Sequence, residues 1–399
     1  MKRSELFITA ALMAVRGAAA VASGGARSPD SVRYRNDEDP LLVFRVDLAQ
    51  GPGQLPQVIH LLPMGAALAV QAAVAACLWV AAASVATRGM SRWWFWAAVA
   101  FGLSPWWLGW DWAVLSESLV LGAMALFAAG SGRWMSSREA AVPMMVGAGI
   151  ALLARPMVAP LVLGMLTVIL LARREVPRPR LAAGAVALLI VAGLVQSAMF
   201  NASTPSYEYV GPGTTMAGIQ ASDRMAARWN NTGYLEAAAS FGMPQCEIPG
   251  DLDEGFAGSA TLRELPCAGM SDWLNAGGLP WWAELIHLPG TTLREVVAGE
   301  WTADTWQGYM RGSHLVPQPI AVAVDVLMWL ALATACGAIV TVGGPHRGAR
   351  TLIALGALGY ALVLILVDGQ ENWRHILPAL VVLVPFALGV FSRQASPEP

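Results

Sequence analysis

Acidic and arginine side chains recur at the edges of the apolar segments of this chain, and their types suit proton transfer and phosphate binding. The first group lies in the polar stretch at residues 27–40, where Asp30 is followed by Ser31 and Tyr34. A carboxylate can accept the proton of a hydroxyl, and an arginine can hold a phosphate by two parallel hydrogen bonds. We therefore interpret the set as one group-transfer site. Its candidate catalytic acids are Asp30 and Glu117, its candidate phosphate ligands are Arg155 and Arg374, and its supporting residues are Ser31, Tyr34, Ser116, Asp368 and Glu371.

These residues also have ordinary structural explanations, which the sequence leaves open. The stretch at 27–40 could be a solvated connector. Glu117 could stabilise the first turn of a helix through the helix dipole, and Arg155 could extend to lipid headgroups. Arg374 could pair with Glu371, three residues before it.

The composition indicates an integral membrane protein. Of the 399 residues, 56% are hydrophobic and 13% are charged, whereas about a quarter of the residues of a soluble domain are charged. Apolar runs of membrane-spanning length recur, so the expected fold class is all-α integral membrane. The net charge of −2 offers no basic surface, so no nucleic-acid partner is expected.

We expect about ten transmembrane helices. The apolar runs lie at residues 6–22, 61–86, 93–110, 115–130, 141–154, 158–172, 181–200, 319–342, 351–367 and 376–391. They form an N-terminal transmembrane module at 1–200, with a first outer loop at 23–60, and a C-terminal module at 317–399. A large extracytoplasmic loop region at 201–316 separates helices seven and eight. The first run also resembles a signal peptide, but Arg16 interrupts it, so we favour a retained helix.

The basic residues predict the orientation of these helices. One set of short connectors holds Lys2, Arg3, Arg88, Arg92, Arg133, Arg138, Arg173, Arg174, Arg178, Arg180, Arg347, Arg350 and Arg393. The short connectors of the other set hold only Arg155 and Arg374. Basic connectors stay in the cytoplasm, so the candidate site and the 201–316 region are expected outside. The expected location is the plasma (inner) membrane, with many passes and an extracytoplasmic active site.

Tryptophans mark both ends of the third apolar run. They are Trp93, Trp94 and Trp96 at its start, and Trp106, Trp107 and Trp110 at its end. Tryptophan gathers at membrane–water interfaces, so the pattern predicts an interfacial belt at each end of one span.

The four cysteines fall into two pairs. Cys77 and Cys336 lie within apolar runs, where a single cysteine is usually a small buried side chain. Cys246 and Cys267 lie in the outer region and could form a disulfide in an oxidising compartment, or remain two unpaired thiols.

The order of these motifs resembles that of the GT-C class glycosyltransferases, membrane enzymes that use sugars carried on lipid phosphates. Members of that family have an acid and a tyrosine in the first outer loop, and a Ser-Glu that opens a later helix. An Arg-Pro ends a mid-chain span, and a late arginine precedes a proline. The matching residues are Asp30, Ser31, Tyr34, Ser116, Glu117, Arg155, Pro156, Arg374 and Pro378. They cover most of the membrane portion, whereas 201–316 matches nothing in the family.

The resemblance implies a GT-C-like fold and a sugar donor linked to polyprenyl phosphate. It implies transfer of a hexose or pentose to a hydroxyl of a cell-envelope glycan, glycolipid or protein. Asp30 would accept the proton of that hydroxyl as it attacks the anomeric carbon, and Arg155 and Arg374 would stabilise the departing phosphate. One direct displacement implies inversion. Rival carboxylates in the same loop are Asp37, Glu38 and Asp39.

Metal dependence stays open, and no other cofactor is expected. Some relatives use a divalent metal near the first-loop acid. His60, His314 and His375 lie at the ends of apolar runs and could be its ligands, although an isolated histidine at an interface is usually a bystander.

Two other classes of membrane protein fit the outline. An O-antigen-type polymerase or ligase also has many spans and one large outer loop, although that loop usually carries clustered arginines. A polytopic transporter is the second alternative, because Arg16 and Asp325 lie within apolar runs and could mark a pathway. These two residues could equally pair with each other.

Overall fold

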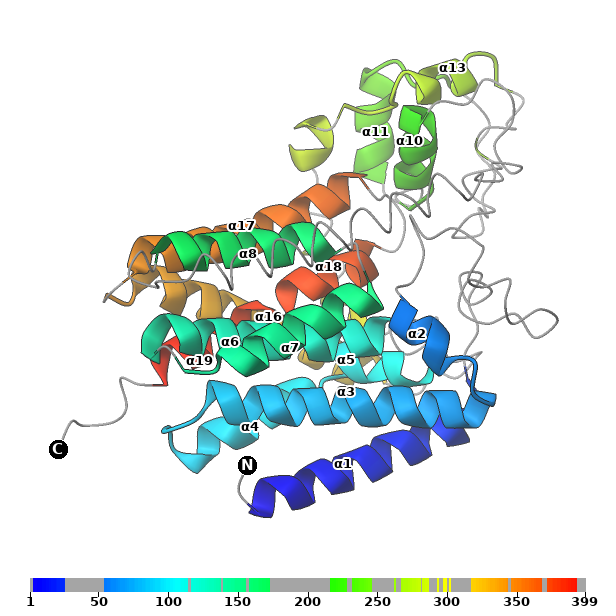
Figure 1. Cartoon of the computed structure of the whole chain (residues 1–399). Coiled ribbons are helices and arrows are strands. Elements are labelled where there is room, and N and C mark those ends of the chain that lie inside the picture. Colours follow the sequence, from blue (N-terminus) through cyan, green and yellow to red (C-terminus); the bar gives the residue numbers. More distant parts are fainter. Residues whose placement is uncertain are drawn as a thin grey trace. The chain divides into compact units, whose positions relative to one another are not determined.

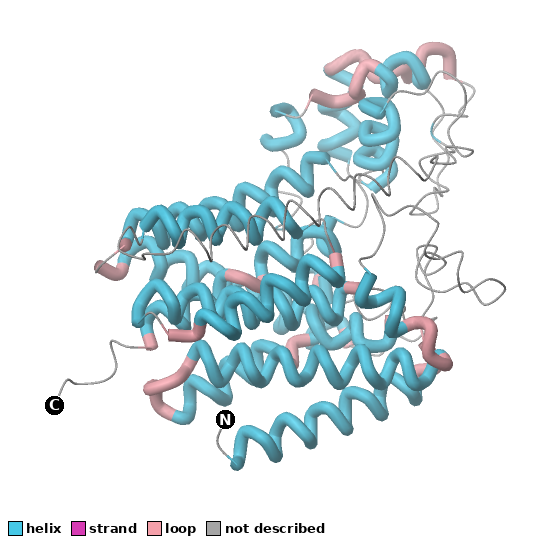
Figure 2. Tube along the Cα trace, in the orientation of Figure 1, coloured by secondary structure: helices cyan, strands magenta, loops and turns pink. Residues whose placement is uncertain are grey.

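The computed structural model of this chain contains helices and turns, and no strand occurs among the residues that it describes (Figure 2). The described residues are 3–25, 54–113, 116–137, 139–155, 158–172, 216–227, 232–245, 262, 267–280, 282–286, 293, 297–299, 301–302, 317–343, 346–367 and 372–392. The prediction of an all-helical chain is therefore confirmed for this part.

The chain divides into two compact units, which are described separately. The first comprises Met1–Pro205, Gly299–Leu358 and Pro378–Pro399, and the second comprises Ser206–Ala298 and Gly359–Leu377. The helices of the first unit are α1 (Arg3–Ala22), α2 (Gln54–Ile59), α3 (Met64–Ala86), α4 (Arg92–Gly102), α5 (Pro105–Leu108), the 3₁₀ helix η3 (Gly109–Trp112), α6 (Glu117–Ser137), α7 (Ala141–Ala154), α8 (Ala159–Ala172), α16 (Gln318–Thr341) and α19 (Leu383–Phe391) (Figure 1). The second unit contains α10 (Met216–Ala227), α11 (Thr232–Ser240) and α13 (Met270–Asn275), and parts of α17 (Arg347–Val367) and α18 (Asn372–Leu380) belong to each unit.

Among the described residues, three helices are long and apolar enough to cross a membrane. They are the segments Glu5–Ala22, Met64–Ala86 and Gln318–Thr341. Shorter apolar helices lie at Ala141–Ala154, Ala159–Ala172 and Ile376–Phe391. The larger set of ten spans stays a prediction, and its seventh member, 181–200, lies outside the described residues.

Helix α6 is the centre of the first unit. It packs against α3, α7 and α19 (Figure 1). Nearly all of its side chains are buried, because its sequence between Glu117 and Arg133 is apolar or small on every face. A helix without a polar face can only be stable when other helices or lipid surround it.

Glycines allow the neighbours of α6 to approach its backbone. A Cβ atom at Gly147 of α7 would lie 2.4 Å from the backbone nitrogen of Phe127 in α6. On the α19 side, a Cβ at Gly132 would lie 2.3 Å from the carbonyl oxygen of Phe386, and one at Gly389 would lie 2.6 Å from that of Ala129. Such close packing through small residues is a main source of helix association in membranes.

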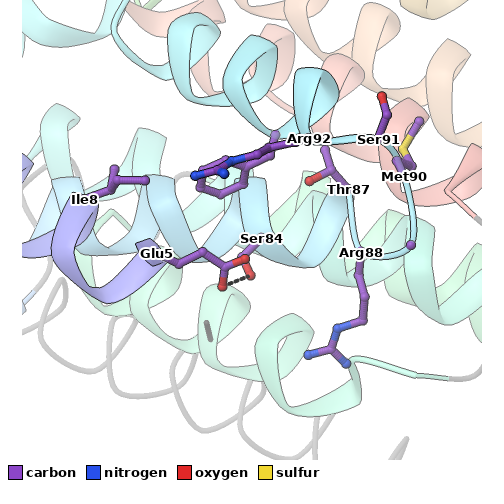
Figure 3. A pocket seen from close by; sticks show the side chains of 10 residues that line it. Glu5, Ile8, Ser84, Thr87, Arg88, Met90, Ser91 and Arg92 are labelled. Carbon is purple, nitrogen blue, oxygen red and sulfur yellow. Dashed lines mark hydrogen bonds between the residues drawn. The ribbon is translucent and has the colours of Figure 1, made fainter. Parts of the chain in front are cut away.

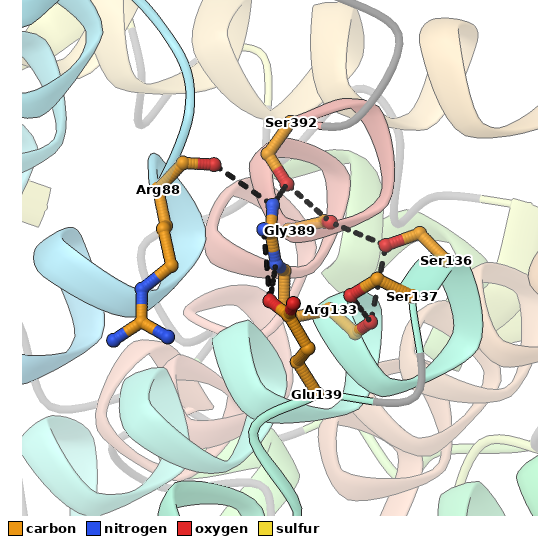
Figure 4. Close-up of polar contacts among 7 residues, drawn as sticks. All are labelled: Arg88, Arg133, Ser136, Ser137, Glu139, Gly389 and Ser392. Carbon is orange, nitrogen blue, oxygen red and sulfur yellow. Dashed lines mark hydrogen bonds and ion pairs between the residues drawn. The ribbon is translucent and has the colours of Figure 1, made fainter. Parts of the chain in front are cut away.

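Arg133 joins four segments at the C-terminal end of α6. Its guanidinium donates to the carbonyl oxygen of Arg88 at 2.8 Å and to the hydroxyl of Ser392. It also forms an ion pair with Glu139 at 3.0 Å. Figure 4 shows these contacts converging on the one guanidinium. Arg133 thereby connects the turn after α3, the last residues before α7 and the end of α19 to α6.

The third apolar run differs from the expected single span. Helix α4 ends at Gly102, and the chain continues as α5 and η3. Pro105 explains the break, because proline disfavours the helical conformation of the residue before it and has no N–H to donate. Ser104 accordingly has extended backbone angles and caps α5.

The tryptophans are exposed, as an interfacial belt requires, at only one end of that run. Trp93 is 82% exposed, and Trp94 and Trp96 are also exposed, as predicted. In contrast, the indoles after Pro105, those of Trp106, Trp107 and Trp110, are fully buried. The prediction of a second belt was therefore wrong for the described structure, since these rings form core.

The last apolar run is likewise interrupted. Expected as one segment at 376–391, it consists of the end of α18 and all of α19, with a turn at residues 381–382. Pro385 lacks the N–H that a continuous helix would direct at the carbonyl of residue 381, which explains the interruption.

The second unit has its own small core. Tyr234, Met225 and Leu274 are buried in it together with a charged pair. The guanidinium of Arg224 lies 2.9 Å from the carboxylate of Glu284, to which the Tyr234 hydroxyl donates at 3.2 Å. The buried charges of Arg224 and Glu284 are therefore paired with each other, as burial requires.

The glycine contacts lead to a first prediction. Gly147→Ala should lower the free energy of unfolding by about 1–3 kcal/mol, because the new methyl meets backbone atoms of α6 that cannot rotate away. Gly149→Ala is the matched control, since no atom lies within 4 Å of a Cβ there, and it should be neutral or stabilise by up to about 1 kcal/mol. Thermal unfolding of both variants in detergent measures the difference. Equal effects would contradict backbone-level packing of α7 on α6.

Candidate functional site

Several buried charged side chains gather where α6 begins. Helix α6 and helix α7 run antiparallel, so the first residue of α6 and the residue after α7 lie at the same end of the pair. We call the set Arg16, Asp111, Glu117, Ser118 and Arg155 the α6 N-terminal cluster. All five residues are at most 8% exposed.

Glu117 and Arg155 are in direct contact. The Nη1 atom of Arg155 donates to Oε1 of Glu117 at 2.5 Å, and only 1% of the Glu117 side chain is exposed. Both were candidate site residues from the sequence, one as an acid and the other as a phosphate ligand. The structure brings them together from positions 38 residues apart.

The local sequence explains why these two residues meet. Pro156 follows Arg155, and a residue before proline avoids the helical conformation. Arg155 therefore leaves α7 with extended angles, φ −154° and ψ 96°, while its N–H still bonds to the Ala151 carbonyl. Glu117 occupies the first turn of α6, where the helix dipole favours a negative charge.

A second ion pair in the cluster was not predicted. The Nε and Nη2 atoms of Arg16 donate to the two carboxylate oxygens of Asp111, at 2.5 and 2.7 Å. The Ser118 hydroxyl also donates to Asp111. The alternative that Arg16 pairs with Asp325 is therefore wrong, because Arg16 has a two-pronged partner in η3.

The two ion pairs are joined by consecutive residues of one helix. Glu117 holds Arg155, and the next residue, Ser118, holds Asp111. The cluster consequently ties α1, η3, the start of α6 and the end of α7 together. Asp111 lies between Trp110 and Trp112. An isolated acid among large apolar residues needs a buried partner, so the sequence could have predicted that Asp111 forms an ion pair.

His60 and Gln71 support the segment that carries Asp111. The Nε2 atom of His60 lies 3.1 Å from Oε1 of Gln71. The amide nitrogen of Gln71 donates to the carbonyl oxygens of Trp110 and Ala113, at 3.2 and 3.0 Å. Both side chains are buried, so they fix the backbone on either side of Asp111.

Asp325 has partners of its own. It is fully buried in α16 and accepts hydrogen bonds from the indole nitrogen of Trp106 at 2.8 Å and from the Thr302 hydroxyl at 2.5 Å. The Trp106 ring also packs against Trp301, at a centroid distance of 5.0 Å. Asp325 is thus hydrogen-bonded within an aromatic core.

The other predicted residues are described only in part. Ser116 is buried, and its carbonyl oxygen accepts the N–H of Val120 at 3.0 Å. Arg374 lies in α18, but its side chain is outside the described structure. Cys267 is disulfide-bonded, whereas Cys77 and Cys336 are free. The residues that lie outside the described part altogether are Asp30, Ser31, Tyr34, Cys246, Asp368 and Glu371.

Metal ligands do not cluster in the described part of the chain. It contains no group of three or more His, Cys, Asp or Glu side chains that could hold a metal ion. Of the histidines considered as ligands, His60 contacts Gln71, while His314 and the side chain of His375 lie outside the description. Metal dependence therefore stays untested.

The cluster leads to a second prediction, on stability. Asp111→Asn should lower the free energy of unfolding by about 3–5 kcal/mol, because it leaves the buried Arg16 guanidinium without a counter-charge. Arg16→Met should have a similar cost. The double variant Arg16→Met/Asp111→Asn should lose clearly less than the sum, since neither charge then remains.

Chemical or thermal unfolding in detergent measures this double-mutant cycle. Arg347→Met is the control, because it removes an exposed arginine of α17 instead of a buried one. Additive losses in the double variant would show that Arg16 and Asp111 do not depend on each other.

The cluster offers a carboxylate and a guanidinium as neighbours, which are groups that can orient a hydroxyl and bind an anionic oxygen. Comparisons with protein-family models, with curated proteins and with solved structures found no match to this chain.

Proposed function

We propose that this protein is a membrane glycosyltransferase of the GT-C type, which moves a sugar from a polyprenyl-phosphate-linked donor to an acceptor hydroxyl on the extracytoplasmic face. The observation that carries the proposal is the contact between Glu117 and Arg155. Both were assigned to one candidate site from the sequence, and they meet in a buried cluster at the ends of apolar helices. The order of the sequence motifs adds support.

In the proposed reaction, an acceptor hydroxyl oxygen forms a bond to the anomeric carbon of the donor sugar. The bond from that carbon to the phosphate oxygen breaks, and Asp30 takes the hydroxyl proton. The polyprenyl phosphate leaves with the bonding electrons, and Arg155 and Arg374 stabilise its charge. Because one displacement occurs, the anomeric configuration inverts.

Glu117 is assigned a positioning role toward Arg155. A guanidinium carries five N–H donors, and the contact at Oε1 of Glu117 engages the Nη1 side. Holding that side fixes the plane of the guanidinium, which determines where its other donors point. A fixed fork suits two-pronged binding of a phosphate.

The exposed aromatic rings of the second unit suit an acceptor that contains sugars. Phe241 and Trp282 pack edge to face at a centroid distance of 5.2 Å and are 38% and 47% exposed. Large rings that remain partly exposed offer flat apolar surfaces on which the apolar faces of sugars can stack. In this proposal the acceptor is a cell-envelope glycan, a glycolipid or a glycosylated protein.

The proposed orientation of the helices in the membrane can be tested separately from the catalytic roles. The arginine-rich connectors are assigned to the cytoplasm, and the α6 N-terminal cluster and residues 201–316 to the outside. Reporter fusions after residues 175 and 260 should give a cytoplasmic and an extracytoplasmic signal, respectively. A cytoplasmic signal from the fusion at 260 would contradict the proposed location of the site.

The catalytic roles lead to a further prediction. Asp30→Asn should reduce sugar transfer by about 10²–10⁴-fold and leave donor binding intact, because an amide cannot accept the proton. Arg155→Lys should weaken donor binding instead, because a lysine keeps the charge and loses the two-pronged geometry. Glu117→Gln should weaken donor binding in the same direction as Arg155→Lys.

The assay is transfer of radiolabelled sugar by the purified protein from polyprenyl-phosphate donors, with thermal unfolding as a check of the fold. Asp37→Asn is the matched control in the same loop and should retain activity. Loss of transfer in Asp37→Asn but not in Asp30→Asn would move the base within the loop. Absence of transfer by the unaltered protein would contradict the proposal and favour the polymerase, ligase or transporter alternatives.

A further inference from the structure

A cavity with charged walls lies at the other end of α3 from the α6 N-terminal cluster. It has a volume of about 410 Å³ and is bounded by the first turns of α1, the last turn of α3 and the start of α4. Figure 3 shows Glu5 and Ser84 between the side chains of Arg92 and Arg88. None of these residues takes part in the proposed transfer reaction.

Positive charge exceeds negative charge in the cavity wall. Arg88 and Arg92 both line it, and Glu5 is the one acid among the lining residues. The carboxylate of Glu5 accepts a hydrogen bond from the Ser84 hydroxyl at 3.2 Å. In the described part of the chain, neither arginine side chain has an ion pair, so both guanidinium groups are available to an anion.

The N-terminus of α4 opens at the same cavity. Ser91 is the N-cap residue and has extended angles, but its side chain makes no capping hydrogen bond. The Ser91 side chain therefore caps none of the first N–H groups of this 11-residue helix, at the point where Ser91 and Arg92 line the cavity, and the Trp94 N–H bonds to the Ser91 carbonyl oxygen at 3.1 Å. Such a helix end favours an anion through its N–H groups and its dipole.

Exposed tryptophans suit this end of the bundle to the level of lipid headgroups. Trp93, Trp94 and Trp96 follow directly after Ser91 and Arg92, and all three are exposed. The Arg92 guanidinium lies 5.9 Å from the centroid of the Trp96 ring. Tryptophan and arginine together are typical of the interfacial layer, where phosphate groups of lipids are concentrated.

We infer that this cavity binds the phosphate group of an anionic phospholipid, held by Arg88, Arg92 and the N-terminus of α4. The shared chemistry of the ligand is a phosphate ester, and a membrane lipid is its expected source because the cavity adjoins the tryptophan-rich surface. The site is independent of the glycosyltransferase proposal, since it lies at the opposite end of α3 and uses none of the same residues.

The test uses the purified full chain in detergent. Phosphatidylglycerol should raise the midpoint of thermal unfolding by a few degrees, and native mass spectrometry should detect the bound lipid. Phosphatidylcholine and inorganic phosphate, added at the same concentration, should give smaller shifts. An equal shift with phosphatidylcholine would overturn the site, and an equal shift with inorganic phosphate would overturn the lipid as its source.

Charge variants locate the binding. Arg88→Gln/Arg92→Gln should weaken phosphatidylglycerol binding by roughly tenfold or more, as expected when charged hydrogen bonds are lost. Arg347→Gln is the control, because it removes an exposed arginine that does not line the cavity. Equal binding by the double variant and the control would overturn the assignment.

A third variant separates loss of binding from loss of folding. Ser91→Asp keeps a good N-cap residue at the start of α4 and adds a negative charge that the helix dipole favours, so the protein without lipid should be at least as stable as the unaltered chain. The added negative charge faces the cavity, so the lipid-induced shift should disappear. A shift that persists in Ser91→Asp would contradict binding at this helix end.

Discussion

The cost of burying charge in an apolar helix bundle governs the arrangement of the first unit. A buried arginine or carboxylate is tolerated only when a partner neutralises it and completes its hydrogen bonds. Arg16, Asp111, Glu117 and Arg155 meet this requirement in pairs at the start of α6. Arg133 meets it at the opposite end, with Glu139, a carbonyl and a hydroxyl. The ends of helices that are distant in sequence are therefore fixed by charge, while their middles are fixed by shape.

Charged contacts at the helix ends and close packing in the helix middles together explain how a chain with so few charged residues orders its helices. Packing of small residues brings α6 close to its neighbours and already resists sliding of the helices along their axes. The charged pairs strengthen that axial preference, because a shift along the axis would separate the partners inside the bundle. Proline completes the arrangement by ending α7 at Arg155 and by separating α4 from α5, so that charged or aromatic side chains turn inward at those points.

Local sequence signals were sufficient for the helical class and for the positions of α3, α7, α8 and α16. They also selected Glu117 and Arg155, which are in contact in the structure. They were insufficient for Arg16, whose partner lies 95 residues away, because no periodicity encodes such a distance. They also misplaced Trp106, Trp107 and Trp110, since an indole suits an interface and a core equally well. Pro105 was the local signal that the third run would break. It was given too little weight because the apolar stretch is long enough to form one span.

The glycine contacts on both sides of α6 have a mechanical consequence. A helix that slides past its neighbour does so by about one turn, or roughly 5.4 Å. Such a step would bring Leu126 or Trp134 to the place of Gly130, where even a Cβ would lie 2.6 Å from the backbone nitrogen of Met144. Helices α6 and α7 therefore cannot slide past each other by a turn, and we expect them to move as one rigid body. Bending within the first unit is therefore expected at other points, such as the break between α4 and α5 or the turn between α18 and α19.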